Sequence, residues 1–486
     1  MTIELAGIVA LLVGVLFLTR GPGFGINVFV PSTLLGSCAA FTIPAIGATT
    51  IQPAHLLLGF LAISAFIRPA ITSRALHAVA FPSPGFWLLA TTVYGAFSAY
   101  FCPRIFAGAT YVAAIGTTNY GLSMMQVPLG PTSGNITQTL YFIGDVVCFI
   151  VTLLIASSKS GLRLVANAMI VYCGLNIVFA ALDLTAFWTG TEFLLDPIRN
   201  STYVLHLETV VYGFKRIVGS FTEASAFAYA TLGAFAFTAR LWLGGVKPAL
   251  NFSIAMISLV LLAFSTSSTA YAATPVIILY IYLTTGVRFV RETVPTQVLA
   301  FLIVAPIALT LLFVVIQLLP GVNETVRSML DVMLFDKSSS DSAHDRGTWN
   351  EAAMAAFYAT QGLGAGVGSV RASSFPIAVL ANIGVAGGLT YGAFLYHTLF
   401  SRGPQRIDWF AGEVRAAARA ACVAFLVAAT VSGALIDLGL TFFVAAGLAC
   451  GANEVESGAF AAARSRAFFR TRALDAKPVS LANSES

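Results

Sequence analysis

The sequence predicts an all-α polytopic membrane protein, a bundle of about 12 to 13 transmembrane helices, and two observations support this fold class. First, 58% of the 486 residues are hydrophobic, only 10% are charged, and the mean hydropathy is +0.86. Such a composition cannot give a folded chain a water-soluble surface. Second, apolar stretches long enough to cross about 30 Å of hydrocarbon recur along the whole length. We therefore expect a single transmembrane domain over residues 1–452.

Apolar runs bounded by Gly, Pro or charged residues mark the individual helices. The first run has neither a basic leader nor a small-residue cleavage site, so we expect it to remain as an anchor. The predicted spans are 4–19, 54–68, 84–102, 139–157, 164–188, 223–239, 249–267, 270–287, 297–319, 374–400, 418–435 and 437–452. The stretch 21–50 is apolar but interrupted by Gly and Pro, so it is either a further span or a re-entrant piece. The side of the N-terminus depends on that choice.

Most of the Lys and Arg residues, 17 of 26, lie in alternate linkers between these spans or in the C-terminal tail, which holds Arg464, Arg466, Arg470, Arg472 and Lys477. The basic linkers carry Arg68, Arg74, Lys159, Arg163, Arg240, Lys247, Arg288, Arg291, Arg402, Arg406, Arg415 and Arg419. Cytoplasmic loops of membrane proteins are enriched in these residues, so the basic linkers and the basic tail 453–486, which we expect to be flexible, are predicted to be cytoplasmic. The other linkers then face outward, and three of them are long: 103–138, 189–222 and 320–373. Long external loops are where chemistry is expected.

The loop 320–373 has an apolar periodicity of its own. Positions i, i+3, i+4, i+7 and i+8 are apolar at Val326, Met329, Leu330, Met333 and Leu334. This spacing predicts an amphipathic helix that lies either on the membrane surface or against the rest of the protein.

Motifs of soluble enzymes are absent from the sequence. The glycine run Gly362, Gly364, Gly366 and Gly368 has neither the GxGxxG spacing nor a following Lys-Ser/Thr. There is no HExxH, CxxC or DxD, and the six cysteines have neither metal-ligand spacing nor the clustering of a disulfide framework. We therefore expect no metal, no cofactor and no nucleic-acid partner.

Cations in the external loops break the charge rule that orders the rest of the chain. Lys215 and Arg216 precede Glu223 at the start of a span, and Arg346 and Arg371 lie in the last long loop. An arginine at the mouth of a bundle suits a phosphate or diphosphate, because its planar fork donates two parallel hydrogen bonds. The alternative is that these arginines reach lipid headgroups or pair with a nearby acid.

Two residues are candidates for a general base. Glu223 follows Arg216 by seven residues, so a continuous helix would place both on one face, and burial together with the arginine would tune the carboxylate. It could equally be only the counter-ion of the arginine. His344, beside Asp345 and Arg346, is the second candidate, with a solvated loop histidine as the alternative.

Three acids lie within or at the ends of apolar spans: Asp145, Asp183 and Asp437. Acids inside a membrane are functional candidates, although hydrogen bonding between helices is the commoner outcome for a single acid.

Taken in order, these residues resemble the O-antigen polymerase and ligase superfamily. The resemblance rests on Arg216, Gly219, Phe221 and Glu223, on Arg346 and Trp349, on the GxGxG turn of Gly364, Gly366 and Gly368, and on Gly384, Gly387 and Gly388. It covers mainly 210–400. It implies a fold of the C-type glycosyltransferase kind in the bacterial inner membrane, with an active site that faces the periplasm.

The resemblance also implies a polyprenyl-diphosphate-linked oligosaccharide as donor, no metal, and contacts from Arg216 and Arg346 to the diphosphate. We predict further substrate contacts from Lys215, Trp349, Gly366, Gly368, Arg371 and Ser373. Expected partners are the lipid-linked donor and acceptor, membrane lipid, a flippase and a chain-length regulator.

One departure from the superfamily separates its branches. Where the ligase branch carries a histidine, the matching positions are Ser373 and Ser374. The stretch VRASSFPIAVLANIG is similar to Wzy-type exopolysaccharide and capsule repeat-unit polymerases. The resemblance therefore favours polymerisation. Ligation onto a lipid acceptor and transport of a lipid-linked oligosaccharide are the alternatives.

Overall fold

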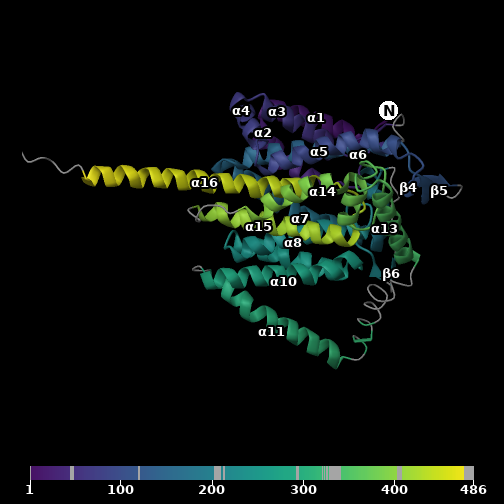
Figure 1. The fold of residues 1–486 in the computed structure, drawn as a ribbon. Helices are drawn as coiled ribbons and strands as arrows, with labels where there is room; N and C mark the ends of the chain where they lie inside the picture. The colour runs from purple at the N-terminus through teal and green to yellow at the C-terminus, as the bar shows by residue number, and fades with distance from the viewer. Residues whose placement is uncertain are drawn as a thin grey trace, which may run out of the picture.

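A computed structural model describes residues 2–43, 49–118, 121–201, 210–211, 214–291, 295–319, 321, 323–324, 327, 341–401 and 408–475. The chain is mostly helical. Its longer helices are α1 (Leu5–Arg20), α2 (Pro22–Ser32), α3 (Pro53–Phe66), α4 (Pro69–Ala78), α5 (Pro84–Ile105), α6 (Ser133–Ala156), α7 (Lys159–Thr189), α8 (Ala224–Leu243), α9 (Pro248–Phe264), α10 (Ser268–Arg291), α11 (Thr296–Leu318), α13 (Asp341–Ala359), α14 (Phe375–Phe400), α15 (Trp409–Ser432) and α16 (Leu440–Asp475). Most of them run roughly parallel to one axis (Figure 1).

The predicted apolar runs all fall on helices, which confirms a helical membrane protein. Within the described residues, eight helices are long and apolar enough to cross a membrane: α5, α6, α7, α8, α10, α11, α14 and α15. Shorter apolar helices are α1, α3 and α9. The total of 12 to 13 spans stays a prediction. The last predicted span does not end at 452, because α16 continues as helix through the first part of the basic tail, to Asp475.

Small residues hold the centre of the bundle together. α8 packs against α9 and α15, and α15 packs against α16. At Gly233 of α8, a Cβ would collide with the Phe425 ring of α15, so only glycine allows this approach. Close contact through Gly and Ala is how helices associate in a membrane, where apolar side chains gain little by leaving lipid. In contrast, α11 leans away from the bundle, and none of its most apolar window is buried (Figure 1).

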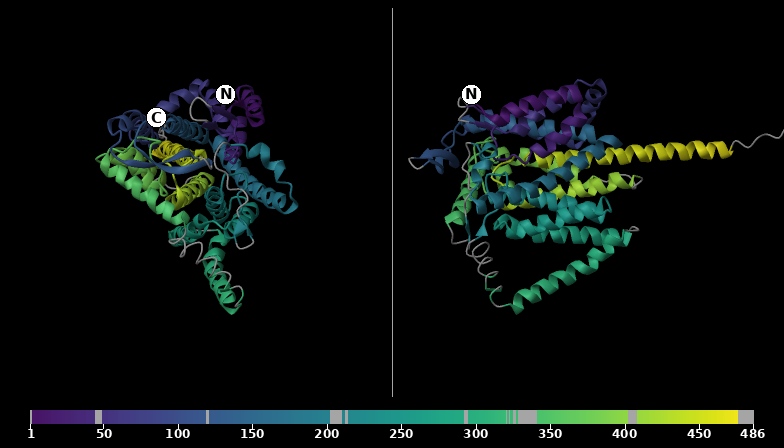
Figure 2. Two further views of the ribbon diagram at one scale, coloured as in Figure 1. Left: turned by 90° about the vertical axis from the view of Figure 1, so that its right-hand side faces the viewer. Right: turned by 180° about the vertical axis from the view of Figure 1, so that it is seen from behind.

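The described parts of the three long loops gather at one end of the bundle, which we call the loop end. There the loop 103–138 forms a hairpin of β4 (Tyr111–Thr118) and β5 (Gly121–Pro128), the loop 189–222 contains the short helix η2 (Glu192–Ile198), β6 (Val210–Val211) and β7 (Phe214–Lys215), and α13 lies across the helix ends (Figures 1 and 2). The all-α prediction missed these strands. The predicted amphipathic segment 326–334 lies outside the described residues, apart from Arg327.

The stretch 21–50 brings the chain back to the loop end. β1 (Thr2–Ile3) pairs with β2 (Phe41–Ile43), which pairs with β3 (Thr49–Ile51). The short helix α2 therefore runs back beside α1, and the N-terminus lies at the loop end (Figure 1).

The described parts of the basic linkers meet at the opposite end, which we call the basic end; Arg402 and Arg406 lie outside the described residues. Lys159 pairs with Asp408 across two linkers, with 2.8 Å between Nζ and Oδ2. Arg288 of α10 makes a two-pronged pair with Glu413 of α15, at 2.6 and 2.9 Å. These cations were predicted to share one side of the membrane, and the fold places them together.

Arg415 and Arg419, expected in a linker, lie instead inside α15, which begins nine residues before the predicted span. Arg415 donates a hydrogen bond to the side-chain oxygen of Asn453 at 2.8 Å, and Arg419 donates one to the Ser401 carbonyl at 2.7 Å. These bonds allow the two cations to lie within the helix, since each has polar partners there.

Candidate functional site

A buried carboxylate fixes the loop that carries Arg216. Oδ1 of Asp183, near the end of α7, accepts hydrogen bonds from Arg199 at 2.6 Å and from Lys215 at 2.5 Å. Oδ2 accepts the backbone N–H groups of Val218 at 2.8 Å and Gly219 at 3.0 Å. The Asp183 side chain is fully buried. Because both oxygens have charged or backbone donors, the pairing offsets the cost of burying the carboxylate.

Lys215 therefore does not face the predicted substrate site. Its side chain is only 1% exposed, and its ammonium lies between Asp183 and the Phe187 ring, 4.9 Å from the ring centroid. The geometry supports a structural role for Lys215. Arg199 has the same structural role. It was not among the predicted site residues, although it too is a cation in an external loop.

The segment between Arg216 and Glu223 is not helical. The prediction that a continuous helix places both residues on one face was therefore wrong. β7 ends at Lys215, the chain turns at Gly219 with φ of +61°, and α8 begins only at Ala224, after Glu223. The turn is held by the segment after α2, where the Ser37 hydroxyl donates to the Ser220 carbonyl at 2.9 Å. A turn fixed by hydrogen bonds, rather than two turns of helix, sets the spacing between the side chains of Arg216 and Glu223.

Arg216 lies at the point where three parts of the chain meet. The side chain is partly buried, and its Nε has no hydrogen-bond partner among the described residues. Burial lowers the pKa of the guanidinium, the Glu223 carboxylate raises it, the Arg346 guanidinium lowers it, and Tyr271 of α10 raises it. The predicted pair Arg216 and Arg346 is thus close enough for their charges to interact, although 130 positions separate them in the sequence.

Glu223 sits at the N-cap of α8 and differs from the expectation in one respect. Its carboxylate accepts a hydrogen bond from the Ser225 hydroxyl, and the residue is exposed rather than buried. An exposed carboxylate beside Arg216 can serve as counter-ion or as base, but it lacks the burial that was expected to tune it.

The helix α13 supplies Arg346 and Trp349, which lie about one turn apart and so on a similar face. Asn350, the next residue, accepts the backbone N–H of Ser373 at 2.7 Å and so ties α13 to the start of α14. Ser373 is largely buried at this junction. His344 lies in the first turn of α13, and its side chain is outside the described residues.

The glycine run packs against protein. Gly362, Gly364, Gly366 and Gly368 all have positive φ, between +77° and +99°. A Cβ on Gly366 would lie 2.7 Å from the Ser98 carbonyl of α5, and one on Gly368 would collide with the Gly134 carbonyl of α6. The two glycines predicted to contact substrate therefore let the backbone pass between helices. Arg371 follows this run, and its N–H donates to the Ala113 carbonyl of the hairpin at 3.4 Å.

The same glycine run hydrogen-bonds to the backbone of α14 where that helix is interrupted. Gly384 has φ of +60° and ψ of −162°, which interrupts the helix. The carbonyls of Ala381 and Asn382 accept the N–H groups of Ala365 and Gly366, at 2.8 and 2.9 Å. Backbone groups released by the break are thus satisfied by protein, as a membrane interior requires.

The chemistry that this arrangement supports is anion binding. Arg216, Arg346 and Glu223 together carry one more positive than negative charge, and guanidinium forks match phosphate oxygens. Tyr271 was not foreseen; its hydroxyl donates to the Ala263 carbonyl at 2.9 Å, which holds the ring at the α9–α10 turn beside Arg216.

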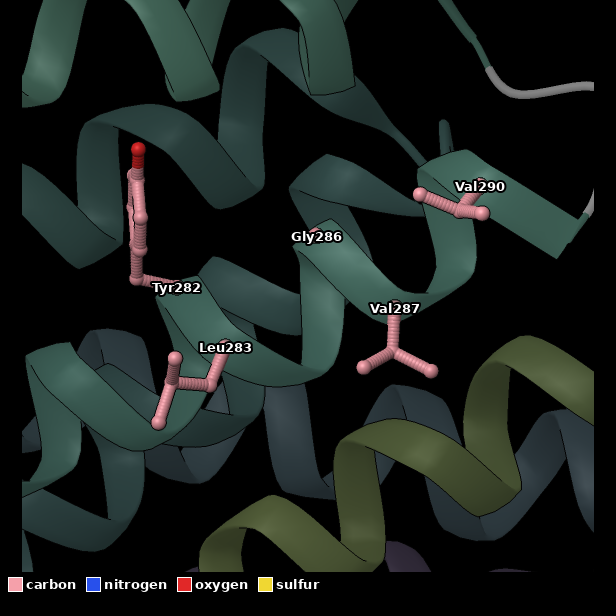
Figure 3. A pocket seen from close by; sticks show the side chains of 5 residues that line it. All are labelled: Tyr282, Leu283, Gly286, Val287 and Val290. Atoms are coloured by element: carbon pink, nitrogen blue, oxygen red, sulfur yellow. The ribbon is translucent and has the colours of Figure 1, made fainter.

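A separate apolar hollow lies on α10, lined by Tyr282, Leu283, Gly286, Val287 and Val290 (Figure 3). It carries no charged side chain and lies near Arg288, at the basic end. Eleven or more residues of helix separate it from Tyr271, a rise of roughly 16 Å or more. The hollow is therefore not part of the arginine site.

The fold and the site define a helical membrane protein with a cationic site at one end of its bundle. The chain matches no protein-family model, no curated protein and no solved structure.

Proposed function

We propose that this protein is a bacterial inner-membrane polysaccharide polymerase. It transfers a polyprenyl-diphosphate-linked glycan onto an incoming lipid-linked repeat unit at the periplasmic face. The observation that supports the proposal is that Arg216 and Arg346 lie close enough at the loop end for their charges to interact. Two guanidiniums repel each other, so holding them together costs free energy that a bound dianion would return. A diphosphate has the charge and the oxygen geometry for both forks.

In the proposed reaction, the acceptor hydroxyl oxygen attacks the anomeric carbon of the donor glycan. The bond from that carbon to the diphosphate oxygen breaks, and polyprenyl diphosphate leaves with the electron pair. Arg216 and Arg346 stabilise the negative charge that develops on the leaving group, which is commonly the largest catalytic term. Glu223, the exposed carboxylate beside Arg216, takes the proton of the acceptor hydroxyl.

The test is a reconstituted reaction of the purified full-length protein with a polyprenyl-diphosphate repeat unit, without metal or nucleotide. The proposal predicts release of polyprenyl diphosphate together with a ladder of longer lipid-linked glycans. No release and no ladder from well-folded protein would contradict it.

The same assay separates the two alternatives. A ligase would leave the repeat-unit length unchanged and move the glycan to an added lipid acceptor. A transporter would move the substrate across proteoliposomes without breaking the diphosphate bond. The filled break in α14 weighs against transport, since the backbone groups freed there are occupied by the glycine run.

A further inference from the structure

Asp145 is an acid in the middle of α6 that the proposed reaction does not use. Its side chain is fully buried, and no N–H or O–H group of the described residues donates to either carboxylate oxygen. Asp183, the other fully buried aspartate, receives two cations and two backbone N–H groups. An ionised carboxylate without donors is very costly inside a membrane protein, so the two acids require different explanations.

A second carboxylate lies within side-chain hydrogen-bonding reach of Asp145. Asp437 lies beside it on the turn between α15 and α16, and its Oδ1 accepts the Gly439 N–H at 2.5 Å. Two tyrosines hold this turn inside the bundle. Tyr229 of α8 donates to the Leu438 carbonyl at 2.5 Å, and Tyr391 of α14 donates to the Ile436 carbonyl at 3.2 Å. The turn is therefore fixed from two sides, and the two carboxylates cannot easily move apart.

A histidine completes the group. His55, near the start of α3, interacts with Asp437, and its ring lies against Tyr141 of α6 with 4.7 Å between centroids. Its Nδ1 is buried and has no partner among the described residues. It is a second buried polar atom without a partner in the described part of the chain, in a side chain whose charge interacts with that of Asp437.

The side chains around Asp145 and Asp437 decide which cation the two carboxylates can bind. The titratable groups that face Asp145 within the described residues are Asp437, Cys148 of α6, Tyr391 of α14 and Tyr229 of α8, with His55 of α3 beyond Asp437. None of them is Lys or Arg. Because Asp145 has no exposed surface, neither water nor a hydrated cation fits against its oxygens. A metal cation needs several ligands, and no group of three or more His, Cys, Asp or Glu among the described residues could hold one, whereas a proton needs only the two carboxylates.

We propose that Asp145 and Asp437 form a proton-binding site inside the bundle, in which Asp145 holds the proton and the partly exposed Asp437 exchanges it with solvent. Two neighbouring carboxylates share a proton because like charges at close range cannot both be ionised at low cost. The turn that carries Asp437 reaches the loop end, where the Ala434 carbonyl accepts the Ala372 N–H at 3.3 Å. This site does not depend on the proposed transfer reaction.

Infrared spectroscopy of the full-length protein in lipid nanodiscs tests the proposal, since a protonated carboxyl has a C=O band separate from that of carboxylates. We expect the band near pH 7 in the wild type, its loss in Asp145→Asn, and its retention in Glu351→Gln, which changes an exposed carboxylate of α13. Asp437→Asn removes the like charge, so the band should disappear at a lower pH than in the wild type.

Absence of the band in the wild type, its persistence in Asp145→Asn, or an unchanged midpoint in Asp437→Asn would each overturn the proposal. Asn resembles the neutral acid in shape and charge, so Asp145→Asn should fold. If it does not, carbodiimide labelling of the wild type decides, since the reagent attacks protonated carboxyls in apolar surroundings. An adduct on Asp145 that declines as pH rises supports the site, and no adduct at any pH contradicts it.

Discussion

At the scale of single residues, the external cations separate into two kinds by the partners they have. Arg199 and Lys215 are sequestered by Asp183 and hold a loop in place. The Nε of Arg216 has no hydrogen-bond partner in the described part of the chain, and its guanidinium lies close enough to Arg346 for the two charges to interact. Cations of the first kind stabilise the fold, and those of the second kind are available to an anionic ligand.

Replacing Asp183 by Asn tests this division. The change leaves Arg199 and Lys215 buried without their carboxylate, so we expect a loss of about 3–5 kcal/mol in the free energy of unfolding. Transfer activity should fall as well, because Arg216 follows Lys215 directly. The measurement is chemical unfolding in detergent, with Asp196→Asn, at an exposed position of the same loop, as control. Equal stability of Asp183→Asn and Asp196→Asn would show that Asp183 does not hold this loop in place.

The sequence identified Arg216 and Arg346 because cations in long external loops stand out against a low-charge chain. It could not separate them from Lys215, since the partner of Lys215 lies 32 residues earlier, in another span. The spacing of residues along the chain does not reveal an ion pair between such distant positions. Tyr271 was missed for the same reason: it reaches the site only through the packing of α10.

At the scale of elements, the glycine run and α14 form one unit. The break at Gly384 opens the helix, and the N–H groups of the run close it. The run also lies against the ends of α5 and α6, where Asn135 donates to the Val367 carbonyl at 2.7 Å and to the Ser369 hydroxyl at 2.8 Å. This unit positions Ser373 and the end of α13, so it supports the site through packing.

Gly364→Ala should damage this unit. The residue has φ of +87°, and a Cβ would lie 2.6 Å from both the Asn382 carbonyl oxygen and the Gly384 nitrogen. We expect a loss of about 1–3 kcal/mol in stability, seen as a lower unfolding temperature in detergent. Gly392→Ala, in the regular part of α14 with open space around its Cα, is the matched control and should unfold at or above the wild-type temperature. A normal unfolding temperature for Gly364→Ala would contradict the role of the run.

Helices were predictable at this scale, and the short irregular elements were not. Long apolar runs fix where the helices lie, because a membrane allows few other structures. The strands of the loop end have no such constraint. The segment 216–223 has apolar residues that suit a helix, but β7 and the turn at Gly219 are set by Asp183 and Ser37, which lie far away in the sequence.

At the scale of the whole molecule, the two ends of the bundle differ in what they carry. The basic end gathers Lys159, Arg288 and their acidic partners, and the loop end gathers the hairpin, α13 and the two arginines of the site (Figure 1). Basic linkers are typical of the cytoplasmic side, so the loop end and the N-terminus are predicted to face the periplasm.

Cysteine labelling tests this orientation. All six native cysteines are free and buried, so they should not react with a membrane-impermeant maleimide. Glu351→Cys on α13 should be labelled from outside intact inner membranes, and His77→Cys on α4 only after the membrane is opened, since both positions are exposed and lie at opposite ends. The reverse labelling pattern would invert the proposed topology.

The rate of polyprenyl-diphosphate release tests the central claim most directly, namely that Arg216 and Arg346 form one diphosphate site. We predict a fall of about 100- to 1,000-fold for each alanine variant. Because both act on the same group, the double variant should lose less than the product of the two effects. Arg104→Ala is the matched control, since that arginine lies at the loop end but is exposed, 4.1 Å from the Tyr100 ring. Near wild-type release by both single variants, or an equal loss in Arg104→Ala, would contradict the account.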